Sequence, residues 1–450
     1  MVEDGRHLAK HRGGITQMKL VMMTPGVLPS AIGRMVRMVT RALLAHGCEV
    51  LIVRTESADL KTDEAHDFGT QTVHWSDTVV IEQALVSADA VIYQIGDYFD
   101  YHEGGIYWLA RQRGIVCLHD FFLGHLFTAW AQLNRKLANS ILEYWYDFQI
   151  AKSYFEYNSS EDFIEGTRQN SPMVEWVVSQ ASAVICHSNW GIDRVLNACP
   201  GPVHVVPLAY EGPVGVNAVT LQPSSGGCRF QILTVGHVNP NKRADSVIRA
   251  IGASEQLRNS ATYTLVGAVQ PDVKLQLESL AASLGVDLRV CGEVSTAGLA
   301  QALQQADMVC CLRRPTLEAA SASTIEAMLS GRAVIVEDVG FYAELPDDCV
   351  RKIRPQYEED DLRFQIEDLA TDPTGRRALG ERAARWAQAT FTADNYALQL
   401  AKIVKSSRRC MLVISTMQVF VHQLAHWGNS QRLMTLPESV DPIRIFESGN

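Results

Sequence analysis

The sequence predicts an α/β protein made of two domains, each with a parallel sheet, that face each other across a cleft. Strand-like and helix-like segments alternate along the chain, which is typical of parallel sheets covered by helices. At 450 residues, the chain exceeds the usual size of one core. Residues 211–228 are rich in Pro, Gly and Ser and almost uncharged, as linkers are, and a new α/β series starts after them.

The predicted domain boundaries follow from this break. Residues 1–210 are expected to form the first domain, 229–400 the second, and 401–450 a helical extension. Ligands of open α/β sheets bind beyond the carboxyl ends of the strands. Two such domains facing each other would therefore hold a ligand in the cleft between them.

The first half opens with a predicted strand at Lys19–Met23 and a helix at Ala31–His46. The stretch Phe121–Val178 is aromatic and helical, is too long for a simple crossover, and is expected to contribute to a cleft wall. The further predicted strands of this half are Glu49–Arg54, Ala90–Ile95, Ile115–Leu118 and Ala183–Cys186. Those of the second half are Arg229–Val235, Tyr263–Val266, Asp287–Cys291, Met308–Leu312 and Ala333–Val336.

The composition excludes several classes of protein. Hydrophobic residues make up 47% and charged residues 20%, as in folded proteins rather than disordered ones. The formal net charge of −10 argues against a general nucleic-acid-binding surface, so no nucleic-acid partner is expected. The N-terminus is polar, and residues 410–427 are interrupted by polar side chains. We expect that segment to be a packed helix, with contact at a membrane surface as the alternative.

Ten cysteines are scattered along the chain without CxxC pairs. They are predicted to be small buried side chains in a reducing compartment, so neither a disulfide frame nor a zinc site is expected, and the predicted location is the cytoplasm. Those inside apolar strand-like runs are Cys117, Cys186, Cys291 and Cys310.

Two carboxylates fall in the stretch LRRPTLEAASASTIEAMLSG, Leu312–Gly331. Glu318 is on the predicted loop after a short strand, and Glu326 is in the predicted helix that follows. Helix N-termini at the ends of parallel strands attract anions, a loop carboxylate can bind sugar hydroxyls, and a carboxylate in the helix can meet a ribose. The arrangement therefore suggests a nucleotide-sugar site. Alternatively, Ser323 and Glu326 form a capping box and Glu318 is a solvated acid, and this element alone does not decide.

The loop Gly236–Arg243 follows the first strand of the second half. A helix that begins near Ala244 would place Lys242 beside its N-terminus, where a cation and free N–H groups can bind a diphosphate. A lysine at a helix start is slightly unfavourable with the helix dipole. This favours a binding role over a solvated side chain.

His119 and Asp120 end another apolar strand. His119 could point into the cleft and bind a substrate hydroxyl, or Asp120 could cap the next helix while His119 bonds a loop carbonyl. These residues alone leave both interpretations open. Ser30–Gly33 open a helix after the first strand and form a weak candidate for a backbone cradle, because the GxGxxG spacing is lacking.

Together, these elements resemble the retaining glycosyltransferases of family four, which have the GT-B fold with two Rossmann-like domains. The element Leu312–Thr316, LRRPT, is similar to that of bacterial members. The other segments that carry the resemblance are Glu318–Glu326, Val235–Arg243 (VGHVNPNKR), Cys117–Asp120 (CLHD), Ala183–Trp190 (AVICHSNW) and Val339–Pro346 (VGFYAELP).

The resemblance implies a role for each matching residue. Glu318 would hold the hydroxyls of the donor sugar, Glu326 the ribose, and Lys242 the diphosphate, while His119 would contact the sugar near its 6-position. The catalytic residues would be His119, Lys242 and Glu318. The nucleotide-sugar-binding residues would be Gly236, His237, Lys242, Arg313, Ala319, Ala320, Ser321, Ala322 and Glu326.

Two positions depart from the family pattern. His237 stands where many members have arginine, which leaves Lys242 and Arg313 as the cationic clamp. The residues after Glu318 are Ala-Ala-Ser in place of the common Gly-Phe-Gly.

The implied enzyme is a retaining hexosyltransferase that uses a UDP- or GDP-sugar and a glycan or lipid-linked glycan acceptor, in bacterial polysaccharide biosynthesis. No metal or other cofactor is expected, because a cationic clamp would stabilise the leaving diphosphate and the chain has no DxD tripeptide. The expected location is the cytoplasm or the inner face of the membrane. The alternatives are a sugar-nucleotide epimerase, a trehalose- or glycogen-type synthase, or a catalytically silent nucleotide-sugar-binding subunit, the last motivated by His237.

Overall fold

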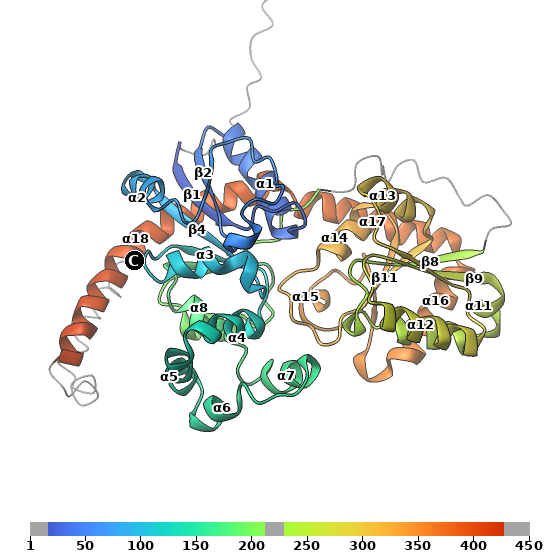
Figure 1. Ribbon diagram of the computed structural model, residues 1–450. Helices are drawn as coiled ribbons and strands as arrows, with labels where there is room; N and C mark the ends of the chain where they lie inside the picture. The colour runs from blue at the N-terminus through green and yellow to red at the C-terminus, as the bar shows by residue number, and fades with distance from the viewer. Residues whose placement is uncertain (1–16, 212–228, 427–450) are drawn as a thin grey trace, which may run out of the picture.

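The computed structural model describes residues 17–211 and 229–426, so the predicted linker lies, apart from Glu211, outside the described residues. Two parallel sheets form two domains, which confirms the predicted fold class (Figure 1). The N-terminal sheet has the order β3-β2-β1-β4-β5-β6-β7, and the C-terminal sheet has the order β10-β9-β8-β11-β12-β13.

The predicted strands are all present, with ends that differ by at most two residues, whereas the short edge strands β3, β7 and β13 were missed. The strands of the N-terminal sheet are β1 (Lys19–Thr24), β2 (Glu49–Arg54), β3 (Thr72–His74), β4 (Ala90–Ile95), β5 (Ile115–Leu118), β6 (Ala183–Cys186) and β7 (Val203–Val205). Those of the C-terminal sheet are β8 (Phe230–Val235), β9 (Ala261–Val266), β10 (Leu288–Gly292), β11 (Met308–Cys311), β12 (Ala333–Glu337) and β13 (Arg351–Ile353).

Helices cover both sheets (Figure 1). In the first half they are α1 (Ala31–Ala45), α2 (Thr78–Ser87), α3 (Phe99–Leu109), α4 (Gly124–Leu133), α5 (Arg135–Trp145), α6 (Phe148–Ser153), α7 (Ser160–Thr167), α8 (Val174–Val178) and α9 (Ile192–Ala198), with the 3₁₀ helix η1 (Ala58–Leu60). In the second half they are η3 (Pro240–Lys242), α10 (Ala244–Gly252), α11 (Glu255–Ser260), α12 (Pro271–Leu284), α13 (Thr296–Gln305), α14 (Ala322–Leu329), α15 (Gly340–Ala343), η4 (Pro355–Tyr357), α16 (Glu358–Thr371), α17 (Pro373–Thr390) and α18 (Ala393–His426).

The central strands are buried on both faces, which explains their continuous apolar sequences. Every residue of β5, IVCL, and of β12, AVIVE, is buried. Parallel strands covered by helices on both sides have this pattern, because neither face meets water. The helix after β1 begins where Ser30 accepts a hydrogen bond from the Gly33 N–H at 3.0 Å, a side-chain cap that satisfies a free donor of the first turn.

The nine described cysteines are free. Cys117, Cys186 and Cys310 are buried, as predicted, but Cys291 is exposed. The prediction for Cys291 was wrong because β10 is an edge strand, whose residues alternate between partly covered and exposed positions.

The long aromatic segment is helical, as predicted, and forms α4 to α8. Its side chains pack in one core with the N-terminal sheet, and there the Trp176 ring lies 5.1 Å from Phe127 and 4.8 Å from Trp130. The start of the segment bonds the other domain: the N–H groups of Phe121 and Phe122 donate to the Leu317 carbonyl at 3.0 and 3.2 Å. The segment therefore contributes to the domain interface through its first residues.

The last helix connects the two domains. α18 starts after the C-terminal domain, crosses the predicted boundary at residue 400, and packs against α1 of the N-terminal domain. Figure 1 shows α18 passing behind the N-terminal sheet and its far end projecting beyond that domain. Tyr396 is buried there, and its hydroxyl lies 3.4 Å from Cys117 Sγ on β5. α18 therefore follows the C-terminal domain in the chain but packs against the N-terminal domain.

Replacing Tyr396 by alanine should destabilise the protein by about 3–5 kcal/mol, because a buried aromatic ring between α18 and the N-terminal sheet would leave a cavity. Urea unfolding followed by circular dichroism measures the loss. Tyr396→Phe keeps the ring and removes only the weak contact with sulfur, so it should cost far less. Equal unfolding midpoints for Tyr396→Ala and the unchanged protein would show that α18 is not part of the N-terminal core.

Candidate functional site

Most of the predicted nucleotide-sugar residues line one cavity in the C-terminal domain. The cavity has a volume of about 280 Å³ and lies where β8 and β11 end. Its predicted walls are Gly236, His237, Lys242, Arg313, Glu318, Ser321 and Ala322, and its further walls are Asn239, Asn241 and Ser323. We call this space the C-domain cavity.

Gly236 lets the chain turn back over the cavity. Its φ of +99° lies in the region that favours glycine. A Cβ at this position would stand 2.9 Å from the Lys242 Nζ. A side chain here would thus both strain the backbone and displace the lysine.

Lys242 reaches the cavity from η3, just before α10, as the sequence predicted. Its Nζ donates to the Val235 carbonyl at 2.6 Å, and the residue is 4% exposed. Burial, with Arg313 adding to it, lowers the pKa of Lys242 to about 7, while Glu318 opposes the shift. An anion in the cavity would favour the protonated form of Lys242. The lysine would then be positively charged when a diphosphate binds there.

Arg243, next to Lys242, does not take part in the cavity. Its guanidinium forms two hydrogen bonds with Glu358, at 2.9 and 3.0 Å. Arg314 also pairs with Glu358 and with Glu337. These ion pairs, with buried carboxylates, hold the loops after β8 and β11 together and leave Lys242 and Arg313 as the lysine and arginine of the cavity wall.

Glu318 is held by two partners. Its Oε1 lies 3.1 Å from Arg313 Nε and accepts a hydrogen bond from the Tyr342 hydroxyl at 2.7 Å. Burial, followed by the nearby Glu318 charge, raises the pKa of Tyr342 well above its usual value, so the hydroxyl remains a donor. A carboxylate that is oriented in this way on a cavity wall is not the solvated loop acid of the alternative interpretation.

The backbone after Glu318 binds the other domain. The Ala319 N–H donates to the His119 carbonyl at 2.9 Å, and the Ala319 carbonyl accepts from Ser188 Oγ at 2.7 Å. Ser321 and Ala322 line the C-domain cavity, whereas Ala319 and Ala320 are not among its walls. The structure therefore brings only the second half of this predicted segment to the cavity.

Glu326 lies on the buried side of α14, away from the walls of the C-domain cavity. Its side chain bonds the Tyr210 hydroxyl and lies near Arg34 of α1. Burial raises its pKa, and Arg34 opposes the shift. The capping-box alternative is wrong, because Ser321 occupies the N-cap of α14 and Ser323 lies inside the helix.

His119 faces the interior of the N-terminal domain. Its Nε2 lies 2.7 Å from Gln94 Oε1, and its ring centroid lies 4.9 Å from that of His187. Burial, with His187 adding to it, lowers the pKa of His119 well below its ordinary value, so the ring is neutral near pH 7. The expectation that the His119 side chain points into the cleft is not met by this arrangement. Its neighbour Asp120 lines an interdomain cavity instead.

This second space, the interdomain cavity, has a volume of about 410 Å³. It shares Asn241, Arg313 and Glu318 with the C-domain cavity. The remaining walls come from the N-terminal domain, except for Leu317: Ser30, Ala31, Ile32, Gly96, Asp97, Tyr98, Tyr101, His102, Asp120, Phe122 and Leu317. Two cavities from opposite sheets therefore meet at one pair of charged side chains.

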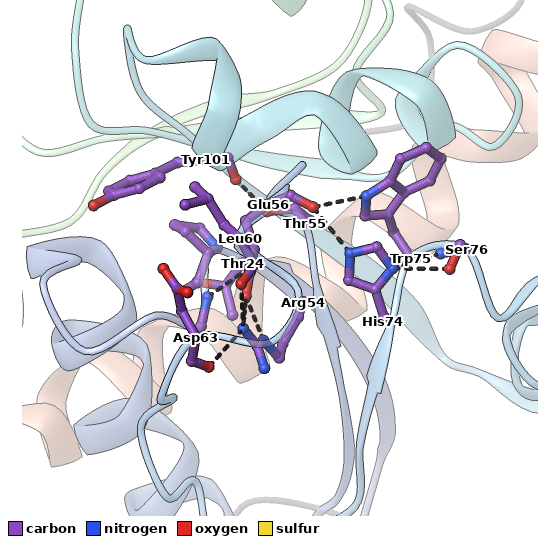
Figure 2. Close-up of polar contacts among 12 residues, drawn as sticks. Thr24, Arg54, Thr55, Glu56, Leu60, Asp63, His74, Trp75, Ser76 and Tyr101 are labelled. Carbon is purple, nitrogen blue, oxygen red and sulfur yellow. Dashed lines mark hydrogen bonds and ion pairs between the residues drawn. The ribbon is translucent and has the colours of Figure 1, made fainter. Parts of the chain in front are cut away.

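A buried ion pair fixes the loop between β1 and α1, which supplies Ser30 to this wall. The Glu56 carboxylate, 0% exposed, pairs with Arg54 and accepts from the Gly26 N–H at 3.0 Å. Figure 2 shows Arg54 and Glu56 at the centre of a polar network at the ends of β2 and β3. The Glu56 carbonyl accepts from His74 Nε2 at 3.0 Å and from Trp75 Nε1 at 2.8 Å. Glu56, just after β2, thus orders the loop after β1 and the loop after β3.

Sequence analysis missed several residues of these cavities. Asp97 lies two residues beyond the end of β4, and Asn241 lies in η3, which follows β8. The rule that ligands bind at the ends of parallel strands would have found both residues. Tyr342 and Tyr210 carry no local signal, because each meets its glutamate only through the fold.

Within residues 17–211 and 229–426, no group of three or more His, Cys, Asp or Glu side chains is arranged to hold a metal ion. In that same part of the chain, no helix combines the length and the apolar character needed to cross a bilayer.

Comparison with known proteins defines the class of this fold. Residues 224–386 match the family of glycosyl transferases group 1. The chain is similar to the sucrose-phosphate synthase from Thermosynechococcus elongatus, with 16% identity and a TM-score of 0.60 over 86% of this chain and 98% of that one. A comparison with curated protein sequences finds no match.

Two further solved structures are similar. HepE from Anabaena, solved in complex with UDP-glucose, has 15% identity and a TM-score of 0.57 over 87% of this chain and 100% of that one. WaaG, a glycosyltransferase involved in lipopolysaccharide biosynthesis, has 14% identity and a TM-score of 0.55 over 86% of this chain and 99% of that one. The chain therefore has the GT-B fold of these glycosyltransferases.

Replacing Lys242 by methionine should change how stability depends on pH. The folded state lowers the Lys242 pKa from 10.5 to about 7, so between these values the unfolded chain binds the proton more tightly. The stability that this group contributes is present above the unfolded pKa and is lost as the pH falls through about 7.

Urea unfolding of both proteins at pH 6.5 and pH 9 measures this effect. The unchanged protein should gain stability relative to Lys242→Met as the pH rises. Lys274→Met, on the exposed helix α12, is the control and should show no such trend. A constant difference between the two proteins across this range would contradict the assigned environment of Lys242.

Proposed function

We propose that this protein is a retaining, metal-independent hexosyltransferase that moves a sugar from a UDP- or GDP-sugar to a glycan or lipid-linked glycan. The observation that carries this proposal is the meeting of the two cavities at Arg313 and Glu318. One cavity has the cations for a diphosphate, and the other opens toward the opposite domain. A sugar held at Glu318 would therefore stand between a leaving group and an acceptor.

In the C-domain cavity, Lys242 and Arg313 would receive the diphosphate. Both cations are already buried or paired, so little reorganisation is needed when negative charge develops on the leaving group. Ser321 and Ala322, at the start of α14, place free N–H groups of the first helical turn beside the same space. His237 is exposed at the rim, where it would add polar contact in place of the arginine of other family members.

Glu318 would bind hydroxyls of the transferred sugar. Its Oε1 is engaged by Arg313 and Tyr342, which fixes the orientation of the carboxylate and leaves Oε2 to accept from a ligand. A carboxylate that is positioned before binding loses less freedom when the sugar arrives. Glu326 would reach the ribose only after exchanging its bond with Tyr210.

The likeness to HepE, whose structure contains UDP-glucose, supports a nucleotide-sugar as the donor. The likeness to WaaG supports an acceptor of the kind found in bacterial surface polysaccharides. We place the protein in the cytoplasm, at the inner face of the membrane. The far part of α18 supports that location, because exposed Lys402 and Arg409 are followed by exposed Leu412 and Val413, a combination of cationic and apolar side chains that favours membrane surfaces.

Glu318→Gln should lower kcat/KM for the nucleotide-sugar about tenfold to a hundredfold, because a hydrogen bond to a charged group is lost. Rates of nucleotide release, measured with UDP-glucose and GDP-mannose, give the comparison. Glu293→Gln is the matched control, since Glu293 is an exposed acid on the loop after another strand of the same sheet, β10. Unchanged activity of Glu318→Gln would remove Glu318 from the reaction.

Transfer should continue in excess EDTA, because the leaving diphosphate is assigned to Lys242, Arg313 and backbone N–H groups. The rate before and after chelation measures this, with an added divalent cation as the control. Loss of activity that manganese or magnesium restores would overturn the metal-independent mechanism.

A further inference from the structure

The interdomain cavity contains a carboxylate that the proposed donor site does not use. Asp120 follows β5 directly and lines this cavity together with Glu318. The two residues lie opposite each other in an antiparallel bridge between the domains. Side chains of directly opposed residues in such a pair are neighbours, so Asp120 stands beside the carboxylate assigned to the donor sugar.

One oxygen of Asp120 is fixed and the other is not. Oδ2 accepts a hydrogen bond from the Asp97 N–H at 2.9 Å. Oδ1 has no hydrogen-bond donor among the described residues. Asp120 is only partly buried and lines the cavity, so this oxygen can accept a hydrogen bond from a ligand there.

The structure also orients this carboxylate. Asp97 is itself fixed, because its Oδ1 accepts from the Leu126 N–H at 2.9 Å and its Oδ2 lies 2.6 Å from His125 Nδ1. A Cβ on Gly96 would stand 2.9 Å from Asp120 Oδ2. The absence of a side chain at Gly96 thus allows Asp120 to approach the end of β4.

Asp120 has no structural task as a helix cap. The next helix, α4, begins at Gly124 with Leu123 at its N-cap, and no side chain caps it. This excludes the capping interpretation of the sequence.

In the part of the chain that the structure describes, Asp120 forms no ion pair with a lysine or arginine. Burial, then the charges of Asp97 and Glu318, raise the pKa of Asp120 to about 7, and the charge of His125 opposes them. Arg313 on the opposite wall is paired with Glu318. The environment therefore favours a neutral hydrogen-bond donor such as a sugar hydroxyl beside Asp120.

We propose that Asp120 accepts a hydrogen bond from the attacking hydroxyl of the acceptor in the interdomain cavity and selects acceptors that carry a free hydroxyl there. This inference rests on the proposed function, because it needs a donor sugar at Glu318. It adds a residue of the N-terminal domain whose side chain touches the acceptor and not the nucleotide.

The test separates transfer to water from transfer to a sugar. Nucleotide release from UDP-glucose and GDP-mannose is measured without acceptor, and then with methyl glycosides of glucose, mannose and galactose as acceptor probes. Asp120→Asn should lower kcat/KM for the acceptor probe about tenfold to a hundredfold. Hydrolysis of the donor and affinity for free UDP or GDP should stay within about twofold, because the donor contacts are untouched.

Asp272→Asn, an exposed acid on α12 of the other domain, is the control and should change none of these values. Thermal unfolding establishes that Asp120→Asn is folded, and Asp120→Glu provides a second variant that keeps the charge while shifting its position. Binding of the methyl glycosides, measured by saturation-transfer NMR, should weaken in both variants.

The outcomes separate the two proposals. If the unchanged protein neither hydrolyses nor transfers any nucleotide-sugar, the proposed function fails. If it does so and Asp120→Asn keeps the acceptor kinetics, or if no glycoside binds to the unchanged protein, the role of Asp120 is wrong. An equal loss of donor hydrolysis and acceptor transfer would also overturn it, since Asp120 would then act on the donor.

Discussion

The backbone pairing between the loops after β5 and β11 is the constraint on which the site depends. The Ala319 N–H bonds the His119 carbonyl, and the Leu317 carbonyl accepts from Phe121 and Phe122. Without these bonds the two sheets would present separate strand ends, each with its own shallow opening. With them, the loop that contains Glu318 forms a wall of both cavities.

Two charged side chains near this pairing are wholly or partly buried without a full counter-charge. Lys242 and Asp120 both have pKa values shifted to about 7, one lowered and one raised, and both line the cavities. Isolated charges that are partly removed from water destabilise a fold, so they are retained where a ligand later compensates them. By contrast, the buried Glu337 carboxylate lies outside the cavities and is compensated within the protein, by an ion pair with Arg314.

The sequence predicted the fold and part of the site for the same reason. Apolar runs such as β8 and β11 are strong signals, and the loops after them lie at the cleft, so the sequence placed Lys242 and Glu318 beside one cavity. What failed is side-chain direction. His119 and Asp120 are adjacent, and only tertiary partners such as Gln94 decide which of them turns inward.

Glu326 illustrates the same limit, because its partner Tyr210 is more than a hundred residues away in the chain. No local pattern contains that contact. Three edge strands were missed for another reason: β3, β7 and β13 have only three residues each, too few for a periodic pattern.

The course of α18 has a mechanical consequence. The chain passes between the domains twice, once after Tyr210 and once before Ala393, and the Tyr210 N–H bonds the Phe391 carbonyl at 3.1 Å. The bond between Tyr210 and Phe391 holds the two crossings together at one point, and α18 packs against α1. A rotation of the domains about that point would leave both crossings almost unmoved, but it would have to break the backbone bonds of Ala319 and Leu317 on the cleft side.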